Sequence, residues 1–518
     1  MTTVGSDVDV LIVGGGPVGL TARALLERWG VRALLVEKRE GLSPFPRSRL
    51  VNVRTVEIFR QLGIAEAVTA RAFAAKYGRV RFRDTLREPD FATAAMIGIN
   101  EPIAESPVIG VVTSQDRLEP TLLTASDAPT RFGAELVDLA EDSDGVVAML
   151  ADRQDGTATR VRARYVLAAD GANSAIRQLL DIGTTGPGAV GRSTTVVFEA
   201  DLDGWSADQP AGVYFTARGG FLPLYPEGGW AWIVPTPEDI EGVDWADLVS
   251  RALGPGSDLR VKVLRVEHWV VNAFIAERFR HGRVLLAGDA AHAIPPAGGM
   301  GMNTGVADVH NLCWKLAGVL HGWAGPDLLD TYEPERLPVA LQTLRRAVAN
   351  ARDMRRAQEV RQEQLRSGDD AADGVELPWS ERYFAQLGLV LGVAYRSAAV
   401  LGEGDPHEPG ADYVPTTEPG HRMPHLWLAP DRSTLDAVGE WFTLLTPDPA
   451  GWERRADGPW PLHVETLPEE HAEYCGLSPD GALLIRPDGH VGARWRERPE
   501  EESALHDALK TLAGLADR

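Results

Sequence analysis

The sequence predicts a fold of the α/β class with more than one domain. A chain of 518 residues with 44% hydrophobic residues can bury two or three cores, so a single compact domain is not expected. Residues 8–13 are an apolar, β-branched run that leads into a glycine-rich turn and then into a helical stretch, residues 20–29. Residues 402–420 are rich in proline and glycine and mark a domain boundary.

The acidic composition excludes several classes of partner. The chain has 52 Lys and Arg against 74 Asp and Glu, whereas nucleic acids and anionic membranes select basic patches. Residues 1–9 contain no Lys or Arg, so they lack the basic start of a signal peptide. Cys313 and Cys475 are too isolated to suggest a disulfide framework or a zinc site. We therefore expect a cytoplasmic protein with no nucleic acid, membrane or metal partner.

The glycine-rich turn at residues 14–19 predicts a dinucleotide site. Gly14 permits the tight turn, Gly16 lets the backbone approach a pyrophosphate, and Gly19 allows close packing of the helix. The next strand, residues 33–36, ends at Glu37, where a carboxylate can hydrogen-bond a ribose diol and would repel a 2'-phosphate. FAD and NAD share this ADP half, so the first motif leaves the choice between them open.

Two later motifs favour FAD. An apolar strand ends at Asp170-Gly171, and a second buried strand ends at Asp289, before a Gly- and Pro-rich segment that leads into a helix. The Asp289 carboxylate can hydrogen-bond ribityl hydroxyls. A helix that starts at Gly301 to Asn303 would place positive potential at the flavin pyrimidine edge, where negative charge develops on reduction.

These motifs, in this order, make the chain similar to the class A flavoprotein monooxygenases, the family of para-hydroxybenzoate hydroxylase and the aromatic polyketide hydroxylases. The likeness continues through Asp308, Asn311, residues 314–316 and residues 329–336, so it covers roughly the first two-thirds of the chain. The resemblance implies an FAD-dependent enzyme that consumes NAD(P)H. A second glycine fingerprint for NAD(P)H is not found in the sequence, which is usual in this family.

The resemblance also implies roles for individual side chains. Glu37 would bind the adenosine ribose, Asp170 would contact FAD and the nicotinamide cofactor, and Asp289 would hold the ribityl chain. Pro296 would lie beside the flavin C4a, and the amides of Met302 and Asn303 would meet the flavin O2. The complete set of predicted cofactor-binding residues is Gly14, Gly16, Pro17, Gly19, Glu37, Lys38, Arg47, Gln115, Asp170, Gly171, Asp289, Pro296, Gly299, Gly301, Met302 and Asn303.

No catalytic base is assigned from the sequence. Arg47 and Pro296 are predicted to act in catalysis by positioning the flavin. A base that deprotonates a phenol would raise the nucleophilicity of the ring, and Tyr225 and His292 are candidates, but neither is chosen.

The expected division into domains follows the motifs. Residues 1–180, with a small excursion near 75–110, and residues 276–400 form the two parts of a Rossmann-like FAD-binding domain. Residues 181–275 form an inserted antiparallel β-sheet domain that binds the substrate. Residues 401–518 are similar to the thioredoxin-like C-terminal domain of the larger hydroxylases.

The inserted sheet is rich in aromatic residues, which suits a flat apolar substrate, although most aromatic strand residues belong to the core. Phe221 and Tyr225 are the predicted pocket residues. The strands expected in this sheet are residues 193–201, 212–215, 221–225 and 230–234.

The last part of the chain is expected to contain a strand at residues 441–445 and a pair of strands within residues 482–491, joined by the turn Pro487-Asp488-Gly489. Residues 338–363 are expected to form a long helix before it. Cys475 stands alone, so a redox role for the C-terminal domain is not predicted.

The resemblance implies that NAD(P)H reduces FAD and that a flavin C4a-hydroperoxide transfers one oxygen atom to an aromatic ring. The favoured substrate is a polycyclic ring of polyketide antibiotic biosynthesis, with NADPH or NADH as reductant and a homo-oligomer as one expected state. Baeyer-Villiger insertion, epoxidation and oxidative decarboxylation use the same parts, so they stay open as alternatives. A noncatalytic dinucleotide-binding module stays open as a further alternative.

Overall fold

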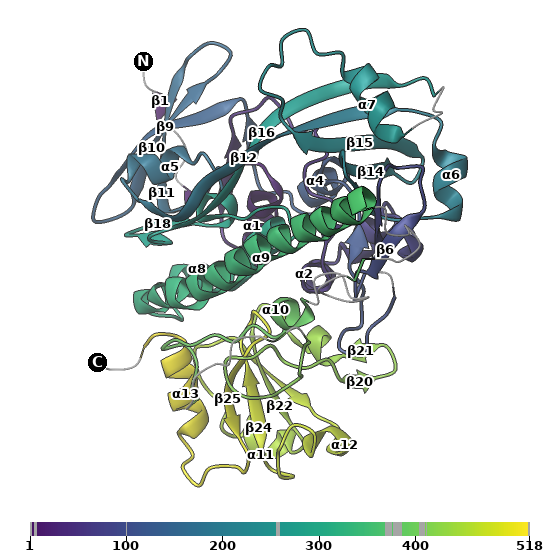
Figure 1. The fold of residues 1–518 in the computed structure, drawn as a ribbon. Helices are drawn as coiled ribbons and strands as arrows, with labels where there is room; N and C mark the ends of the chain where they lie inside the picture. Colours follow the sequence, from purple (N-terminus) through teal and green to yellow (C-terminus); the bar gives the residue numbers. More distant parts are fainter. Residues whose placement is uncertain are drawn as a thin grey trace.

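The computed structural model describes residues 3–4, 8–99, 101–254, 259–367, 375–376, 386–402, 410 and 412–515. Figure 1 shows a first domain and a second β-sheet side by side, with the C-terminal domain packed beneath the long helices of the first domain. Within the proline-rich boundary predicted from the sequence, residues 403–409 and 411 lie outside the described residues. None of the described helices is long and apolar enough to cross a membrane.

The first domain is built on a nine-stranded sheet whose core strands are parallel. Their order is β18 (Val284–Leu286), β11 (Ala158–Ala168), β2 (Val8–Val13), β3 (Ala33–Glu37) and β8 (Thr130–Phe132). Antiparallel strands β9 (Ala134–Glu141), β10 (Val146–Asp152) and β17 (Arg280–His281), and β1 (Thr3–Val4), complete the sheet. Strands β2, β3 and β18 and the C-terminal half of β11 bury apolar residues, as expected for parallel strands covered on both faces.

The register of this sheet brings the three sequence motifs together. Ala168 pairs with both Val13 and Leu286, so strands β2, β11 and β18 end at the same level. Helix α1 (Pro17–Arg28) leaves the sheet directly after the glycine turn, and α8 (Gly301–His321) packs against it. Because the carboxyl ends of parallel strands meet at one edge, the loops after them form one site.

The inserted sheet has eight strands, and we call it the roof sheet. Its order is β19 (His292–Ala293), β16 (Lys262–Ala276), β12 (Thr184–Glu199), β15 (Gly228–Pro235), β14 (Gly219–Tyr225), β13 (Val213–Thr216), β5 (Arg79–Arg83) and β6 (Asp90–Ala95). The four strands expected from the sequence are present as β12 to β15. The hairpin β5–β6 comes from the excursion near 75–110, and it joins the roof sheet because β5 pairs in parallel with β13.

The two faces of the roof sheet have different partners. One face buries an aromatic core with Tyr214, Trp230 and Trp232 against Val249 of helix α7 (Trp245–Leu253). The other face presents a smaller apolar cluster, Val197, Leu222, Leu224 and Ala231, to Phe45 of the first domain. The second face is therefore the one turned toward the first domain.

Helices connect the two sheets. The predicted long helix is α9 (Tyr332–Ser367), which runs along the first domain to the roof sheet (Figure 1), where Arg361 pairs with Asp84 at 2.8 Å. It begins earlier than residue 338 because Pro338 lies within the helix without ending it. The other helices of these domains include α2 (Val53–Gln61), α3 (Ala65–Thr69), α4 (Gln115–Thr124), α5 (Ala175–Leu179) and α6 (Asp203–Asp208).

The C-terminal domain has a four-stranded sheet in the order β23 (Leu462–Thr466), β22 (Phe442–Thr446), β24 (Ala482–Ile485) and β25 (Val491–Trp495). Strands β22 and β23 are parallel and flank α11 (Pro449–Glu453), while β24 and β25 form an antiparallel pair before α13 (Ala504–Leu512). This βαβ–ββα order is that of a thioredoxin-like fold. Cys475 is buried and free, and burial raises the pKa of its thiol to about 12, so it is not a reactive thiolate.

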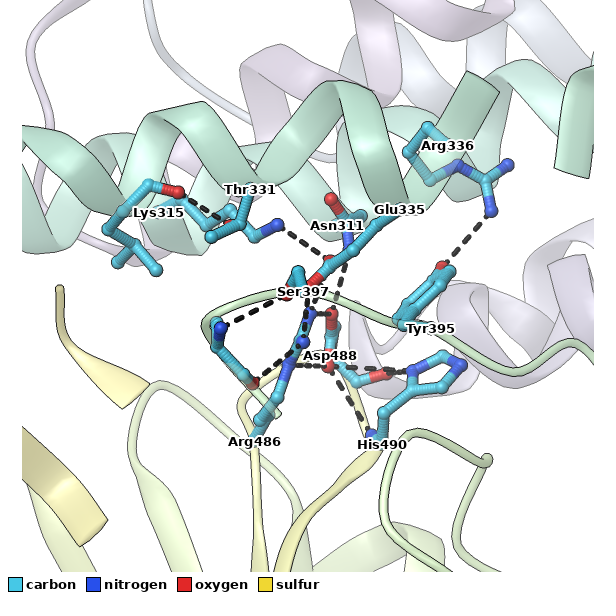
Figure 2. Close-up of polar contacts among 12 residues, drawn as sticks. Asn311, Lys315, Thr331, Glu335, Arg336, Tyr395, Ser397, Arg486, Asp488 and His490 are labelled. Carbon is cyan, nitrogen blue, oxygen red and sulfur yellow. Dashed lines mark hydrogen bonds and ion pairs between the residues drawn. The ribbon is translucent and has the colours of Figure 1, made fainter. Parts of the chain in front are cut away.

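A buried network of charges joins the C-terminal domain to the first domain (Figure 2). Glu335 of α9 accepts hydrogen bonds from Lys315 Nζ at 2.7 Å and from Arg486 Nη1 and Nη2 at 2.7 and 2.8 Å. Arg486 also donates to Asp488, which accepts from the Asn311 amide at 3.1 Å. We call these five residues the junction network. All five are buried, so they bind the two domains as one unit.

Buried His310, beside this network, predicts a pH-dependent stability. Its Nε2 lies 2.7 Å from Gln61 Oε1, and burial lowers the pKa of the imidazole from 6.5 to about 3. The unfolded chain therefore binds a proton below pH 6.5 that the folded chain does not, so stability falls with pH from 6.5 toward 3. Replacing His310 by Gln should remove about 2 kcal/mol of the stability difference between neutral pH and about pH 5.

Urea unfolding at the two pH values measures this difference. The same substitution at exposed His281 is the control and should leave the pH dependence unchanged. Identical pH dependence in the wild type and in His310→Gln would contradict the prediction.

Candidate active site

The three glycines of the first motif have different surroundings. A Cβ on Gly14 would overlap the carbonyl oxygen of Ala169, and a Cβ on Gly19 would overlap the carbonyl oxygen of Gly14. A Cβ on Gly16 would meet no protein atom within 4 Å. Gly14 and Gly19 are thus required by the fold itself, whereas Gly16 faces open space of the kind that a pyrophosphate needs.

Glu37 lies at the end of β3, as the motif predicts. Its Oε2 accepts a hydrogen bond from the Gly15 amide at 2.7 Å, and its Oε1 accepts one from the Arg39 amide at 2.9 Å. These bonds orient the carboxylate beside the glycine turn. Neighbouring Lys38 is exposed.

Two further carboxylates lie at the same edge of the sheet. Asp170 follows β11, and its Oδ1 is buried without a hydrogen-bond partner, while its Oδ2 accepts from the Ile176 amide at 3.2 Å. Burial raises the pKa of Asp170. Gly171, next to it, has a left-handed φ of +86° and no atom near its Cβ position. A buried acceptor with no donor indicates that a ligand supplies one.

Asp289 follows β18 in the short helix η2 (Gly288–Ala290). Its side chain is exposed to solvent, yet burial raises the pKa of its carboxyl. A group that is both accessible and surrounded by protein lines a concave site. The start of α8 lies close by, because a Cβ on Gly301 would be 4.0 Å from Asp289 Oδ1.

The loop before α8 is held against the first domain. Asn303 Nδ2 donates to the carbonyls of Leu50 and Gly299 at 2.9 and 2.7 Å, and its Oδ1 accepts from the Asn52 amide at 2.9 Å. Gly299 has φ +65° and touches Leu50, so a larger residue would not fit. Pro296 is exposed in this loop and Met302 is half-buried in the first turn of α8. The side chain of Asn303 is thus structural, which leaves backbone amides to face a ligand.

Arg47 and Gln115, the remaining predicted residues, lie in and beside one loop of the first domain. Arg47 forms an ion pair with Glu267 of β16 at 3.1 Å, and its positive charge acts on Asp289. Gln115 begins α4, and its Oε1 accepts from the Ser48 amide at 3.3 Å. The Gln115 side chain therefore lies beside the loop that carries Arg47, and Arg47 links this loop to the roof sheet.

The two predicted pocket residues are in different places. Tyr225 ends β14, and its hydroxyl donates to Asp116 Oδ2 at 2.6 Å. Phe221 is fully buried in the core on the α7 side of the roof sheet, with Phe198 and Trp232 as ring neighbours. This placement argues against a role for Phe221 in the pocket, because that face is turned away from the first domain.

His292, a candidate base, has a structural environment. It is fully buried, and its Nε2 lies 2.6 Å from Asp308 Oδ2. Asp308 also accepts from the Gly288 amide at 3.1 Å and from Arg336 Nε at 2.8 Å. Although burial opposes it, the interactions with His292 and Arg336 lower the pKa of the Asp308 carboxyl to about 2. Asp308 and His292 therefore support the turn that presents Asp289, a role that sequence position alone did not indicate.

The geometry fits FAD. Open space at Gly16, an unpartnered buried oxygen at Asp170 and an accessible carboxylate at Asp289 lie along one sheet edge, as an extended dinucleotide requires. Sequence reasoning missed Arg49 and Asp116, which lie near Tyr225; both have an unpartnered buried atom, a signal that only coordinates provide. Among the described residues, no cluster of His, Cys, Asp or Glu could hold a metal ion.

Comparison with known proteins agrees with this site. Residues 7–347 match the family model of the FAD binding domain, and residues 416–516 match that of the aromatic-ring hydroxylase C-terminal domain. A putative polyketide hydroxylase of Streptomyces halstedii is 35% identical, over 98% of this chain and 97% of its own.

Solved structures extend the likeness to the whole chain. The flavin-dependent monooxygenase PieE, in complex with FAD and substrate, is 34% identical with a TM-score of 0.89, over 99% of both chains. Aklavinone-11 hydroxylase, in a ternary complex with FAD and aklavinone, is 33% identical with a TM-score of 0.84, over 99% of this chain and 100% of its own. The chain belongs to the FAD-dependent aromatic-ring hydroxylases and is an FAD-dependent monooxygenase.

Proposed function

We propose that this monooxygenase hydroxylates a polycyclic aromatic substrate between the first domain and the roof sheet. The observation that carries the proposal is the apolar face of the roof sheet, where Leu222 and Leu224 pack with Phe45, two residues before Arg47, whose charge acts on Asp289. An apolar face above a polar cofactor site suits a flat ring. The relatives named as polyketide hydroxylases support a fused-ring substrate.

The side chains have distinct proposed tasks. Bound FAD, reduced by NAD(P)H, supplies the activation of molecular oxygen. Glu37, Asp170 and Asp289 bind the cofactor, and Arg47 and Pro296 position it. The apolar roof excludes water, which protects the oxygen-transfer step from loss as hydrogen peroxide.

Tyr225 is proposed to orient the substrate as a hydrogen-bonding group. Burial and the hydrogen bond to Asp116 raise the pKa of Tyr225 to about 12, so its hydroxyl stays protonated at neutral pH. A protonated phenol that already donates to Asp116 can accept one hydrogen bond from a ring hydroxyl. It is therefore not the base that ionises the substrate.

Oxygen uptake and NAD(P)H oxidation by the purified yellow protein test the proposal, with phenols and fused-ring aromatic polyketides as substrates and mass analysis of products. We expect oxidation that rises with a fused-ring substrate and a product heavier by one oxygen atom. Oxidation without incorporated oxygen would overturn the hydroxylase assignment. NMR distinguishes a ring-expanded or epoxidised product from a phenol. Such a product would show that the enzyme carries out Baeyer-Villiger insertion or epoxidation instead of hydroxylation.

We also propose a cytoplasmic, homo-oligomeric enzyme. Both cysteines are free, which suits a reducing compartment. Val190, Leu264 and Val270 are 50%, 49% and 45% exposed on the paired strands β12 and β16, and an apolar surface there favours self-association. Light scattering of the purified protein measures the oligomeric state, and a monomeric protein would refute the proposed homo-oligomer.

A further inference from the structure

Arg49 spans the space between the first domain and the roof sheet. It precedes β4 (Leu50–Val51), which lies beside the cofactor loops, and its backbone carbonyl accepts from Thr113. Its guanidinium donates to the roof-sheet carbonyls of Gly212, at 2.9 Å, and Pro223. Its guanidinium carbon also lies 5.7 Å from the centre of the Phe73 ring. The cation is thus held in place at the site proposed for the substrate.

This guanidinium lacks a carboxylate partner. No ion pair joins Arg49 to an acidic residue within the described part of the chain, and its Nε is buried without a hydrogen-bond partner. Burial lowers the pKa of Arg49 to about 10, so it is still charged at neutral pH. A buried cation with an unused donor is unfavourable unless an acceptor approaches it. A ligand with an anionic oxygen beside Arg49 would supply the acceptor that this guanidinium lacks.

The charges around Tyr225 leave room for an anion. Arg117 pairs with Glu227, and Arg265 donates to the Pro44 carbonyl at 2.7 Å. Asp116 receives the Tyr225 hydroxyl, and its Oδ1 is buried without a partner. The charge of Asp116 acts on Arg49, but no ion pair joins the two side chains among the described residues. The free acceptor on Asp116 could therefore receive a neighbouring ring hydroxyl, while the buried Nε of Arg49 still lacks an acceptor.

We propose that Arg49 is the residue that selects the substrate by charge: it binds the anionic oxygen of a phenolate or carboxylate on the fused ring. This inference rests on the proposed function, since it assumes that the ring lies beneath the roof sheet. A phenolate held there is also the form of a phenol that is most reactive toward an electrophilic oxygen. Arg49 would favour that form by stabilising the anion, without removing the proton itself.

Binding of three ring compounds to the oxidised holoenzyme tests the inference without requiring turnover. Alizarin, at a pH where it is a monoanion, presents a phenolate, anthraquinone-2-carboxylate presents a carboxylate, and anthraquinone is neutral. Arg49→Met removes the charge, and Arg49→Lys keeps it without the planar fork. Arg192→Met, at an exposed position of β12 in the same sheet, is the control for net charge.

We expect Arg49→Met to weaken binding of at least one anion about tenfold to hundredfold, with anthraquinone affinity and FAD content nearly unchanged. Arg49→Lys should recover part of that affinity, and Arg192→Met should match the wild type. The visible band of alizarin bound to the wild type should be that of the phenolate. Comparing the two anions identifies which oxygen the site prefers.

Three outcomes would overturn the inference. Equal losses of affinity for the anions and for anthraquinone would indicate that Arg49 only stabilises the contact between the first domain and the roof sheet. Unchanged anion binding in Arg49→Met, or no binding of either anion by the wild type, would remove its role in recognition. Failure of the proposed function is a separate result, because it would appear as missing oxygen incorporation in an enzyme whose ligand binding still depends on Arg49.

Discussion

Replacing Glu335 by Gln is expected to lower the free energy of unfolding by about 3–5 kcal/mol. The carboxylate is fully buried and neutralises Lys315 and Arg486, which are also fully buried. The glutamine side chain has nearly the same shape as glutamate, so the variant removes only the negative charge. Lys315 and Arg486 then stay buried without the carboxylate that neutralised them. Urea unfolding, followed by tryptophan fluorescence, measures the loss.

The pair Arg28 and Glu440 provides a matched control. It joins the same two domains, with Nε and Oε1 2.6 Å apart, but both side chains are partly exposed. Glu440→Gln should therefore cost less than about 1 kcal/mol. A similar small loss in Glu335→Gln would show that the junction network does not stabilise the domain contact.

The Glu335→Gln variant is also expected to change how stability depends on acidic pH. Although burial opposes it, Arg486 and Lys315 lower the pKa of Glu335 from 4.5 to about 2. The stability that this carboxylate contributes is complete above pH 4.5 and is lost as the pH falls toward 2. The wild type and Glu335→Gln should thus differ most above pH 4.5 and converge below it.

Local patterns were sufficient to predict that the three motifs meet at one edge of the sheet. Each of the three motifs is a buried strand followed by a turn with glycine or aspartate, and such segments have few alternative folds. Because parallel strands end at one edge, Gly16, Asp170 and Asp289 had to come together once the sheet was expected. The order of motifs then identified the family, and the family model confirmed FAD.

Contacts between distant segments were beyond local patterns. Val80 of β5 pairs with Val213 of β13, and nothing in either strand specifies that partner. Asp488 was predicted in a turn, where Asp-Gly is usually exposed, yet its carboxylate is buried against Asn311 and Trp314. The two faces of an aromatic strand also look alike in sequence, so Phe221 was predicted in the pocket although it packs beneath α7.

The second large effect is expected at Gly16, where Ala should weaken FAD binding about tenfold to hundredfold. The backbone of Gly16 has φ -80° and ψ -178°, which alanine adopts without strain, and its Cβ would meet no protein atom within 4 Å. The apoprotein should therefore unfold as the wild type does, within about 0.5 kcal/mol. The added methyl group would instead occupy space proposed for the pyrophosphate.

Titration of the apoprotein with FAD, followed by flavin fluorescence, and urea unfolding without FAD separate the two effects. Gly191→Ala, at an open position of β12, is the control and should change neither. Gly19→Ala should have the opposite profile, because its Cβ would overlap the Gly14 carbonyl and destabilise the apoprotein itself. If Gly16→Ala binds FAD as tightly as the wild type, the cofactor does not approach this turn, and the proposed site would have to move along the sheet edge.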